Sequence, residues 1–338
     1  MIKFLLCFGV GLAAAFDASD CTQNKHETWM CQYMKNHDKA YSHAAEFLLR
    51  KTKVSQSVEA IRGLGSGFGL TPRSDQFRIP QNIALSLLHH KQVLRSAHQK
   101  HVYKTPPNLP TLDWRTSGQY VTNVVDQGVC GDCFAFASAA VLEYWLAKTG
   151  SPLESISSQL LMDCTSGSGR PDMGCEGGLM EYVFEYAKQH PVVLQREQPY
   201  RGQQQRCPSH LLHSHLRVLG YRVLLHDDDS RSEEQLEHLL HTYGPVAVGI
   251  DSTSMENYRG GIFRSRHCSK NIDHAVTIVG YTKDAWIIKN SWGPNWGRDG
   301  YLYLERGHNA CGVAEYIVYV TDAASTTDAI STDWNYEA

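Results

Sequence analysis

The chain has 338 residues, of which 42% are hydrophobic and 20% are charged, and its formal net charge is −3. This length allows one large domain or two small ones with a real hydrophobic core, and the composition excludes collagen-like and fully disordered chains. A net charge so close to zero also argues against nucleic acid as the main partner.

The charge is divided unevenly along the chain. Residues 16–108 contain 13 Lys and Arg against 7 Asp and Glu, a balance of +6, whereas residues 109–338 contain 18 against 28, a balance of −10. Two interpretations stay open at this point: two independent modules, or one segment built to lie on the other.

The first 15 residues predict a secretory signal peptide. They read MIKFLLCFGVGLAAA, a Lys followed by an apolar run and small residues near Ala15. The alternative is a buried N-terminal helix. No later apolar run reaches the ~18 residues of a membrane span, so none is expected. Removal of Cys7 with the signal leaves nine of the ten cysteines. An odd count in an oxidising compartment indicates paired cysteines plus one free thiol.

Before residue 110 the pattern is mainly helical. Apolar spacing predicts helix over about 24–62, broken by four glycines within Gly63–Gly69, and helix again over 82–99. The Pro-rich stretch 105–110 is expected to be a stiff, exposed linker and a natural site of proteolysis.

After the linker, a strongly apolar helix is predicted over 135–148, and strands gather later in the chain. Helices first and strands later favour an α+β enzyme with two lobes. The last stretch, 321–338, is predicted to be a polar tail. The predicted strands cover 245–250, 275–279, 285–288 and 316–320.

The most informative segment is Gln127–Phe136, which contains Cys130 and Cys133. The Cys-x-x-Cys pair could be half a zinc site, but no second pair follows. It could be a thioredoxin-like redox pair, but no βαβ pattern surrounds it. Two structural cysteines would not explain the odd count. The remaining interpretation places Cys133 at the N-terminal end of a helix, where orphan N–H groups favour a thiolate.

A thiolate nucleophile needs a base and a group that orients the base. His274 lies at the start of a predicted strand, 141 residues after Cys133, and Asn290 follows one hairpin later. Adjacent antiparallel strands could bring the two side chains into contact.

Together these residues resemble the papain-like cysteine peptidases of the cathepsin L type. The resemblance runs from about Asp113 to Tyr319 and includes Cys175–Gly178, Gly244–Val248, Asn290–Gly297 and Cys311–Gly312. It implies an α+β papain-like fold with a helical lobe around a central helix and a β-barrel-like lobe. The active site would lie in the cleft between them.

The resemblance also implies the roles of the catalytic residues. Cys133 would be the nucleophile, and His274 the general base and later the acid for the leaving amine. Asn290 would orient the imidazole under the Trp292 ring. The Gln127 side chain and the Cys133 N–H would form the oxyanion hole.

Further site residues are implied in the same way. Gly178 would pair its backbone with an extended substrate. Apolar walls predict a hydrophobic or aromatic residue at the second position before the scissile bond. A slip of one residue would put Glu315 instead of Tyr316 at the pocket floor and admit Arg. The implied substrate-binding residues are Gly177, Gly178, Leu179, Met180, Ile272, Asp273, Ala275, Trp292 and Tyr316.

The resemblance also accounts for the odd number of cysteines. The implied bridges join Cys130 to Cys175, Cys164 to Cys207, and Cys268 to Cys311, which leaves Cys133 free. Cys21 and Cys31 would form a fourth bridge or stay unpaired.

Two positions depart from the pattern of the family. Asp132 and Phe134 stand where the family usually has Ser and Trp. Asp132 is expected to place a negative charge beside the nucleophile and disfavour the thiolate, whereas Phe134 is expected to keep an aromatic cap on the site.

The front segment, 16–107, resembles the family's propeptide through Glu46, Arg50 and Ile61. Its expected role is to cross the cleft backwards and block it until cleavage near 105–109; a generic helical hairpin is the alternative. The basic segment on an acidic enzyme suggests release on acidification. The peptidase domain would then cover 108–320.

The resulting hypothesis is a monomeric cysteine endopeptidase made as a zymogen, acting on proteins and peptides in a lysosomal or endosomal vacuole or outside the cell. Its own propeptide and cystatin-type inhibitors are the expected partners, with no cofactor, metal, nucleic acid or membrane span. A histidine cluster at 210, 213 and 215 favours a surface loop over a metal site. The alternative function is a catalytically silent relative that acts as a binding protein.

Overall fold

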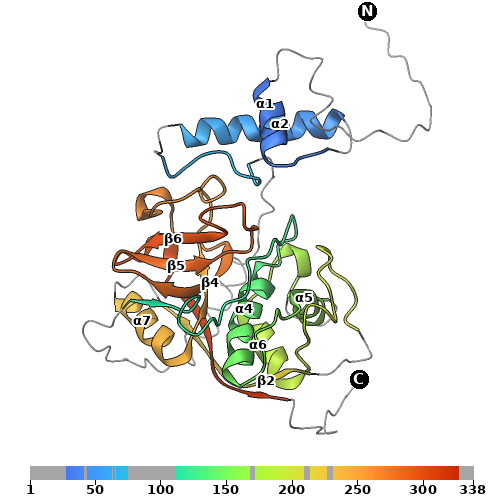
Figure 1. Ribbon diagram of the computed structural model, residues 1–338, viewed down its shortest axis with the longest axis vertical. Coiled ribbons are helices and arrows are strands. Elements are labelled where there is room, and N and C mark those ends of the chain that lie inside the picture. The colour runs from blue at the N-terminus through green and yellow to red at the C-terminus, as the bar shows by residue number, and fades with distance from the viewer. Residues whose placement is uncertain are drawn as a thin grey trace, which may run out of the picture.

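The computed structural model describes residues 28–41, 44–62, 64, 66–74, 111–167, 172–208, 214–226 and 231–326. Two front helices lie across one end of a body made of a helix-rich lobe and a sheet-rich lobe (Figure 1). The predicted signal sequence, the helix expected over 82–99 and the linker 105–110 lie outside the described residues. Over the described parts of the chain, no helix has the length and apolarity to cross a membrane.

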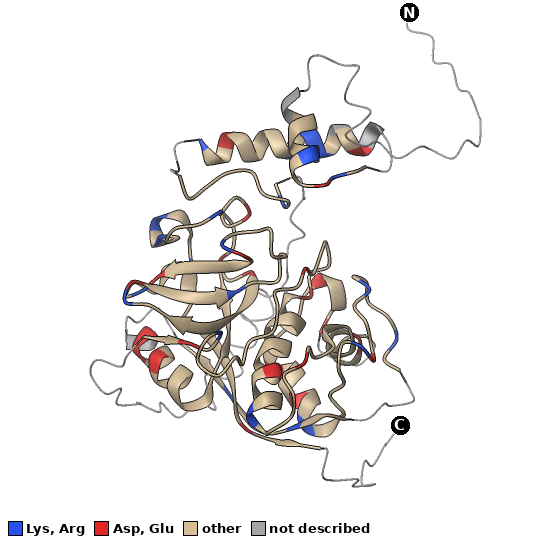
Figure 2. Cartoon of the chain, viewed as in Figure 1, with Lys and Arg blue, Asp and Glu red and all other residues tan. Residues whose placement is uncertain are grey.

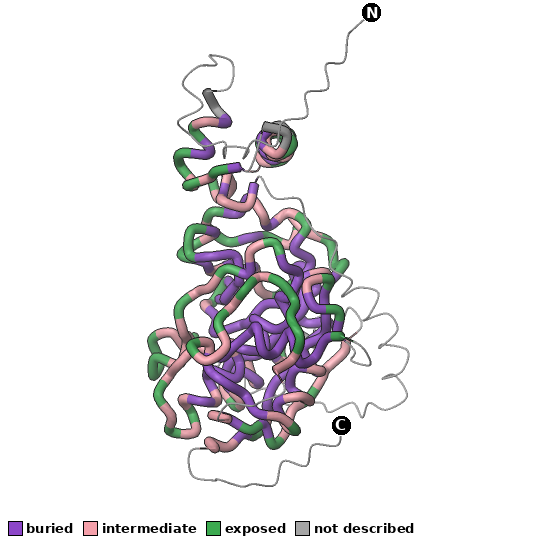
Figure 3. The backbone as a smooth tube through the Cα atoms, turned by 90° about the vertical axis from the view of Figure 1, so that its right-hand side faces the viewer, coloured by how far each residue is buried: buried purple, intermediate pink, exposed green. Residues whose placement is uncertain are grey.

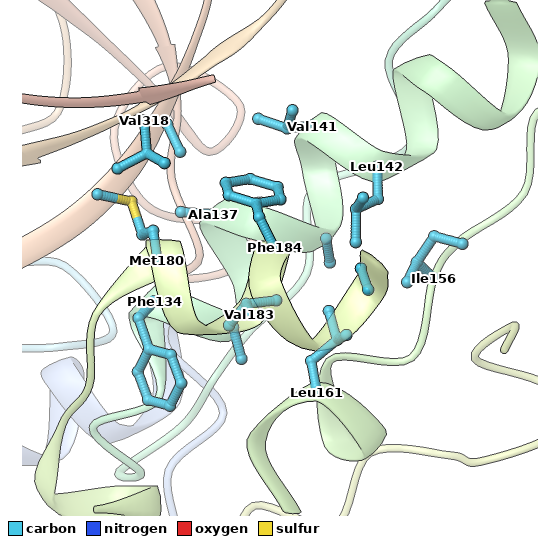
Figure 4. Packing of buried hydrophobic residues seen from close by; sticks show 14 of the residues in the cluster. Phe134, Ala137, Val141, Leu142, Ile156, Leu161, Met180, Val183, Phe184 and Val318 are labelled. Atoms are coloured by element: carbon cyan, nitrogen blue, oxygen red, sulfur yellow. The ribbon is translucent and has the colours of Figure 1, made fainter. Parts of the chain in front are cut away.

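The helix-rich lobe is built around α4 (Cys133–Lys148), with α5 (Ser158–Thr165) and α6 (Met180–Gln189) beside it. α4 is apolar on nearly all sides, so it is buried on nearly all sides. It packs against α6 on one side and against the sheet on another, which makes it the central helix. Figure 4 shows this packing, in which side chains of α4 meet those of α6: Phe134, Ala137, Val141, Leu142, Met180, Val183 and Phe184.

The sheet-rich lobe contains one antiparallel sheet with the strand order β2-β7-β3-β4-β5-β6. Helix α7 (Arg231–Tyr243) packs against it, and β1 (Leu112–Asp113) pairs with β4. The four predicted strands correspond to β3, β4, β5 and β7. The strands of the main path are β2 (Leu216–Leu225), β3 (Val246–Ile250), β4 (His274–Tyr281), β5 (Ala285–Lys289), β6 (Tyr301–Glu305) and β7 (Tyr316–Ser325).

The sheet differs from the β-barrel-like lobe that the resemblance implies, because it is open. The first and last strands of the path, β2 and β6, do not pair with each other in the described residues. β2 instead packs against α6 of the helix-rich lobe, so one edge of the sheet extends away from β6. The lobe therefore contains an open antiparallel sheet.

The polar tail begins later than predicted. Strand β7 continues past Thr321 to Ser325 because β2 pairs with it along its length, with Leu216 opposite Ser325. The Ser325 hydroxyl also lies 3.1 Å from that of Ser151 beyond α4. The predicted start of the tail at Thr321 is therefore wrong, and residues 327–338 lie outside the described residues.

The single helical region predicted over 24–62 is two helices, α1 (Thr28–Asn36) and α2 (Ala44–Ile61). Glu46 and Arg50 form an ion pair across one turn of α2, and Ile61 ends that helix. The two helices share a small core of their own, apart from that of the body (Figure 3): Met30, Tyr33, Met34, Tyr41, Phe47 and Val54. Short 3-10 turns lie at Gly174–Glu176, Ser265–His267 and Ala310–Gly312.

Candidate active site

Cys133 is the first residue of α4 and lies where the helix meets the sheet. Among the cysteines in the described ranges, it alone stands outside a disulfide, and its side chain is fully buried. The backbone N–H of Ala275 donates to its sulfur at 3.3 Å. The nucleophile predicted from sequence therefore lies against the start of β4.

His274 is the first residue of β4, and its imidazole is held from two directions. Its Nε2 lies 2.8 Å from Oδ1 of Asn290, just beyond β5. The Trp292 ring stacks on the imidazole with a centroid distance of 4.8 Å and an interplanar angle of 29°. The structure thus brings together His274, Asn290 and Trp292, as the resemblance implies, and leaves Nδ1 as the other nitrogen for proton exchange.

Gln127 is fixed at both ends of its side-chain amide. Its Oε1 accepts a hydrogen bond from the Ser291 hydroxyl at 2.5 Å, and its Nε2 donates to the Cys130 carbonyl at 2.7 Å. Its backbone N–H donates to the Ser291 carbonyl at 2.9 Å. The amide is therefore held rigidly between the loop before α4 and the segment that follows Asn290.

The environment of Cys133 in this structure favours the neutral thiol. Burial raises the pKa of Cys133 to about 12; the Ala275 N–H opposes this rise, and Asp132 adds to it. The helix N-terminus favours a thiolate, as expected from sequence, but here burial outweighs it. With the front segment in place, the Cys133 thiol is therefore largely protonated at neutral pH.

Two glycines shape the edge next to the nucleophile. Gly177 has φ of +121°, a region that side chains rarely adopt. A Cβ on Gly178 would lie 2.6 Å from the Asp172 carboxylate and 2.8 Å from the Phe134 ring. Only glycine therefore lets the backbone approach α4 so closely. Phe134 is fully buried beneath this edge, and the aromatic cap expected from it stays a prediction.

The residues of the expected apolar pocket lie in one cluster: Leu179, Met180, Ile272, Ala275 and Tyr316. The Tyr316 hydroxyl donates to the Glu181 carboxylate and accepts from the Met180 N–H at 3.2 Å. Glu315 is buried elsewhere, with its carboxylate 3.4 Å from the Asn309 amide nitrogen. Tyr316 and not Glu315 therefore belongs to this cluster.

Asp273 is placed differently from the other residues of the implied substrate site. Its carboxylate accepts hydrogen bonds from the backbone and the hydroxyl of Ser252, at 2.9 and 3.0 Å. Its side chain therefore holds the loop after β3, and its backbone N–H bonds to the Ile250 carbonyl.

Three disulfides join the segments around the site: Cys130–Cys175, Cys164–Cys207 and Cys268–Cys311. These are the pairs that the resemblance implies. They close loops of 43 to 45 residues, a size for which a bridge contributes about 3–4 kcal/mol to folding. Cys31 is disulfide-bonded as well, and Cys7 and Cys21 lie outside the described residues.

The front segment reaches the body through residues 67–71. The Gly67 carbonyl accepts from the backbone N–H groups of Arg259 and Gly260, and the Gly69 N–H donates to the Asn257 carbonyl at 2.9 Å. A Cβ on Gly67 would lie 2.4 Å from the Gly260 carbonyl oxygen. The glycines that sequence reasoning interpreted as a helix break thus permit a backbone-to-backbone contact.

Arg73 extends this contact to the candidate catalytic residues. Its guanidinium carbon lies 4.7 Å from the centroid of the Trp292 ring, which stacks on His274. Its Nη1 is 3.2 Å from the Gly128 carbonyl and 3.5 Å from the Asp126 carboxylate. Sequence reasoning missed this residue, and its only signal was the basic balance of the segment. Figure 2 marks the charged residues of the front segment and of the body beneath it.

The described residues contain no cluster of side chains suited to a metal ion. Of the histidine cluster, His215 lies 3.0 Å from the Glu197 carboxylate. Positions 210 and 213 fall outside the described ranges.

Comparisons with known proteins agree with this geometry. The family profile described as "Papain family cysteine protease" matches residues 109–321. The chain is 34% identical to cathepsin 7 of Mus musculus over 93% of its own length and 97% of that protein. It is 31% identical to pro-cathepsin H of Bos taurus over 92% of its length and 95% of that protein.

Solved structures show the same likeness, including the front segment. The structure of digestive procathepsin L 3 from the larval midgut of Tenebrio molitor matches with a TM-score of 0.72 and 29% identity. That match covers 89% of this chain and all of the other. The similarity therefore includes the front helices as well as the two lobes.

Proposed function

Because the chain belongs to the papain family of cysteine proteases, as a cathepsin-like peptidase with a propeptide, we propose that it is a zymogen of an endopeptidase that uses Cys133, His274 and Asn290. One observation carries this proposal. Cys133, which is outside any disulfide, begins α4 and lies against the start of β4, where His274 is held by Asn290 at 2.8 Å. This is the arrangement of a nucleophile, a base and a group that orients the base.

The reaction follows from these positions. The Cys133 sulfur, after giving its proton to Nδ1 of His274, attacks the scissile carbonyl and forms a tetrahedral intermediate. His274 then donates this proton to the amine as the C–N bond breaks, which leaves a thioester. A water molecule, deprotonated by His274, hydrolyses the thioester and restores the thiol.

The oxyanion would be stabilised by two N–H donors. The Gln127 amide has two N–H bonds, of which one goes to the Cys130 carbonyl, so the other serves the substrate oxygen. The backbone N–H of Cys133 at the helix start is the second donor. Gly178 would pair with the extended substrate on the acyl side.

The front segment is proposed as an intramolecular inhibitor. We assign 1–15 to a signal peptide, 16–107 to the propeptide and 108–320 to the enzyme, extended to Ser325 by the rest of β7. Support comes from the contacts of Gly67, Gly69 and Arg73 with the body, and from the Lys53–Glu256 ion pair at 3.3 Å. Within the described residues, the two ion pairs across this contact, Lys53–Glu256 and Arg73–Asp126, place the cation on the front segment, which agrees with the uneven charge. Cleavage near 105–109 would release it.

Arg73→Ala is expected to weaken the closure of the precursor. The substitution removes a cation–π contact worth about 1–2 kcal/mol and a partly exposed ion pair worth ~0.2–1 kcal/mol. At pH 7 the intact precursor should therefore be labelled at Cys133 by a thiol-reactive probe about eight- to 150-fold faster.

The matched control is Arg62→Ala, since the Arg62 side chain is 73% exposed and its ion pair is with Glu59. This variant should label at the original rate. Equal rates for the Arg73 variant and the original precursor would contradict a closing role for Arg73.

We propose a preference for a hydrophobic or aromatic residue at the second position before the scissile bond. The apolar cluster with Tyr316 at its floor supports it. In a fluorogenic peptide library, Leu or Phe at that position should exceed Arg by about tenfold or more in kcat/KM. A guanidinium would lose its water on entering the apolar cluster, and the Glu181 carboxylate there already accepts from the Tyr316 hydroxyl.

Glu315→Gln is the matched control for the library. It should leave this preference unchanged. A strong preference for Arg that disappears in the Gln variant would show that Glu315, and not Tyr316, faces the substrate.

The proposed setting is a lysosomal or endosomal vacuole or the extracellular space, with the enzyme acting as a monomer and inhibited by cystatin-type proteins. The second candidate function is a silent relative that binds other proteins, which the departures at Asp132 and Phe134 keep open. Reaction of Cys133 with an electrophile separates the two functions.

The deciding experiment is labelling with an epoxysuccinyl probe, followed by mass spectrometry of the peptide that contains Cys133. The processed protein should react at Cys133 and lose its activity in proportion, whereas the intact precursor should react much more slowly. No reaction after removal of the front segment would favour the binding protein.

A further inference from the structure

Asp132 directly precedes the proposed nucleophile, and its side chain is used in an unusual way. It is the N-cap residue of α4, and its carbonyl accepts from the N–H of Ala135 at 2.9 Å. Its carboxyl group, however, makes no capping hydrogen bond, although Asp at this position commonly makes one. The side chain is fully buried and points instead to Tyr200.

The hydrogen bonds of Tyr200 fix the number of protons at this point. The Tyr200 hydroxyl oxygen lies 2.8 Å from the Gln127 carbonyl oxygen and 3.0 Å from Oδ1 of Asp132. A carbonyl and a carboxylate only accept, whereas a phenol has one proton to give. With Asp132 ionised, one of the two short contacts would hold two oxygens together without a proton.

A protonated Asp132 satisfies both contacts. The carboxylic acid donates to the Tyr200 oxygen, and the Tyr200 proton goes to the Gln127 carbonyl. The chain of hydrogen bonds then runs from Asp132 through Tyr200 to the backbone of the residue that supplies the proposed oxyanion donor.

The surroundings of Asp132 also disfavour its charge. Its Oδ2 is buried and has no hydrogen-bond partner in the described residues, and no ion pair of Asp132 occurs there either. Burial raises the pKa of Asp132 to about 8, and Asp163 of α5 adds to this rise. A hydrogen bond donated by Tyr200 to the ionised carboxylate opposes it but does not outweigh burial. The titratable neighbours are Tyr200, Cys133 and Asp163, with Asp126 and Arg73 acting on Tyr200.

We propose that Asp132 is a neutral carboxylic acid in the active enzyme and acts as a positioning residue, holding the Gln127 backbone through Tyr200. This proposal deepens the proposed function and rests on it. Contrary to the expectation from sequence, an uncharged Asp132 leaves the Cys133 thiolate unopposed. When Asp132 loses its proton, a buried charge appears next to the nucleophile and the chain of hydrogen bonds loses a donor.

The test compares the pH dependence of kcat/KM for the processed enzyme with those of Asp132→Asn and Tyr200→Phe. Asn is neutral at every pH and can still donate to Tyr200. We therefore expect it to retain activity at pH 5–6 within about threefold and to move the alkaline limb upward by about one pH unit. Tyr200→Phe should lower kcat at all pH values with little change in KM. The matched control, Asp322→Asn on an exposed position of β7, should follow the original enzyme.

A second measurement keeps the proposal testable without hydrolysis. In the intact precursor with Cys133→Ala, infrared spectroscopy with isotope-labelled Asp should detect absorption of protonated carboxyl groups at pH 6. Asp132→Asn should remove one component of this absorption, while the component of the buried Asp172 should remain. The Asp132 component would survive even if the proposed peptidase function failed. Absence of that component would overturn the proposal, as would an alkaline limb unchanged in the Asn variant or a hundredfold loss at pH 5–6.

Discussion

A precursor carrying Cys133→Ala is expected to hydrolyse no peptide measurably and to remain uncut near 105–109. Removal of the sulfur eliminates the thioester route, and what remains is binding and electrostatic stabilisation alone. Loss of a nucleophile in a hydrolase of this kind lowers kcat by on the order of 10⁴-fold or more. The measurement is the hydrolysis of a fluorogenic peptide, together with the mass of the chain after incubation at acidic pH.

The fold should tolerate this substitution, because alanine is smaller than cysteine and is apolar in a fully buried position. An unchanged melting temperature would establish that the loss is chemical. A thiol-directed inhibitor excludes contaminating cysteine proteases. Hydrolysis by the Ala variant in its presence would contradict the proposed mechanism.

Gln127→Ala is expected to lower kcat by about 10²–10³-fold with a small change in KM. The amide donor acts mainly on the oxyanion of the tetrahedral intermediate, so its removal raises the energy of the transition state more than that of the bound substrate. Steady-state kinetics of the processed enzyme, with active sites counted by titration with the epoxysuccinyl probe, measures the effect.

Ser291→Ala is the matched control for Gln127. It removes the hydroxyl that holds Oε1 of Gln127 at 2.5 Å but leaves the N–H donor in place. Ser291→Ala should lower kcat by clearly less than Gln127→Ala does, by about tenfold or less. A loss of this size corresponds to the net contribution of one hydrogen bond. If kcat fell by the same factor in both variants, Gln127 would be acting through the structure of its loop and not as a hydrogen-bond donor.

The parts of the fold that were predicted from sequence have strong local patterns. α4 is a long apolar run closed by Gly150, and β3, β4 and β5 are runs of apolar residues that the sheet buries. β2 was missed because its residues alternate irregularly between buried and exposed, with a shift of register near Gly220. Since β2 was missed, the end of its partner β7 was placed too early.

In the candidate site, too, some residues could be predicted from local motifs and others could not. Cys133, His274, Asn290 and Gln127 were named from motifs, because the chemistry needs these side chains at recognisable places. The role of Arg73 depends on a contact between residues far apart in sequence, which no local pattern encodes. The protonation of Asp132 depends on burial and on a hydroxyl 68 residues away, so the sequence predicted a charge where the fold favours a neutral acid.

The buried acids have a consequence for the pH range in which the protein is most stable. Burial raises the pKa of Asp172, as it does that of Asp132, to about 8, far above the value near 4 of an unfolded chain. Between about pH 4 and pH 8 the folded protein therefore retains protons that the unfolded chain releases, and the free energy of unfolding falls as the pH rises.

The acidic limit of the pH range of highest stability is set by carboxyl groups such as Asp251. Burial acts to raise its pKa, but hydrogen bonds from Ser269 and Thr253 outweigh burial and lower it. Groups of this kind lose their contribution only when the pH falls below about 4. Mild acid thus favours the folded chain on both counts, and a rise of the pH from about 4 toward 8 lowers its free energy of unfolding.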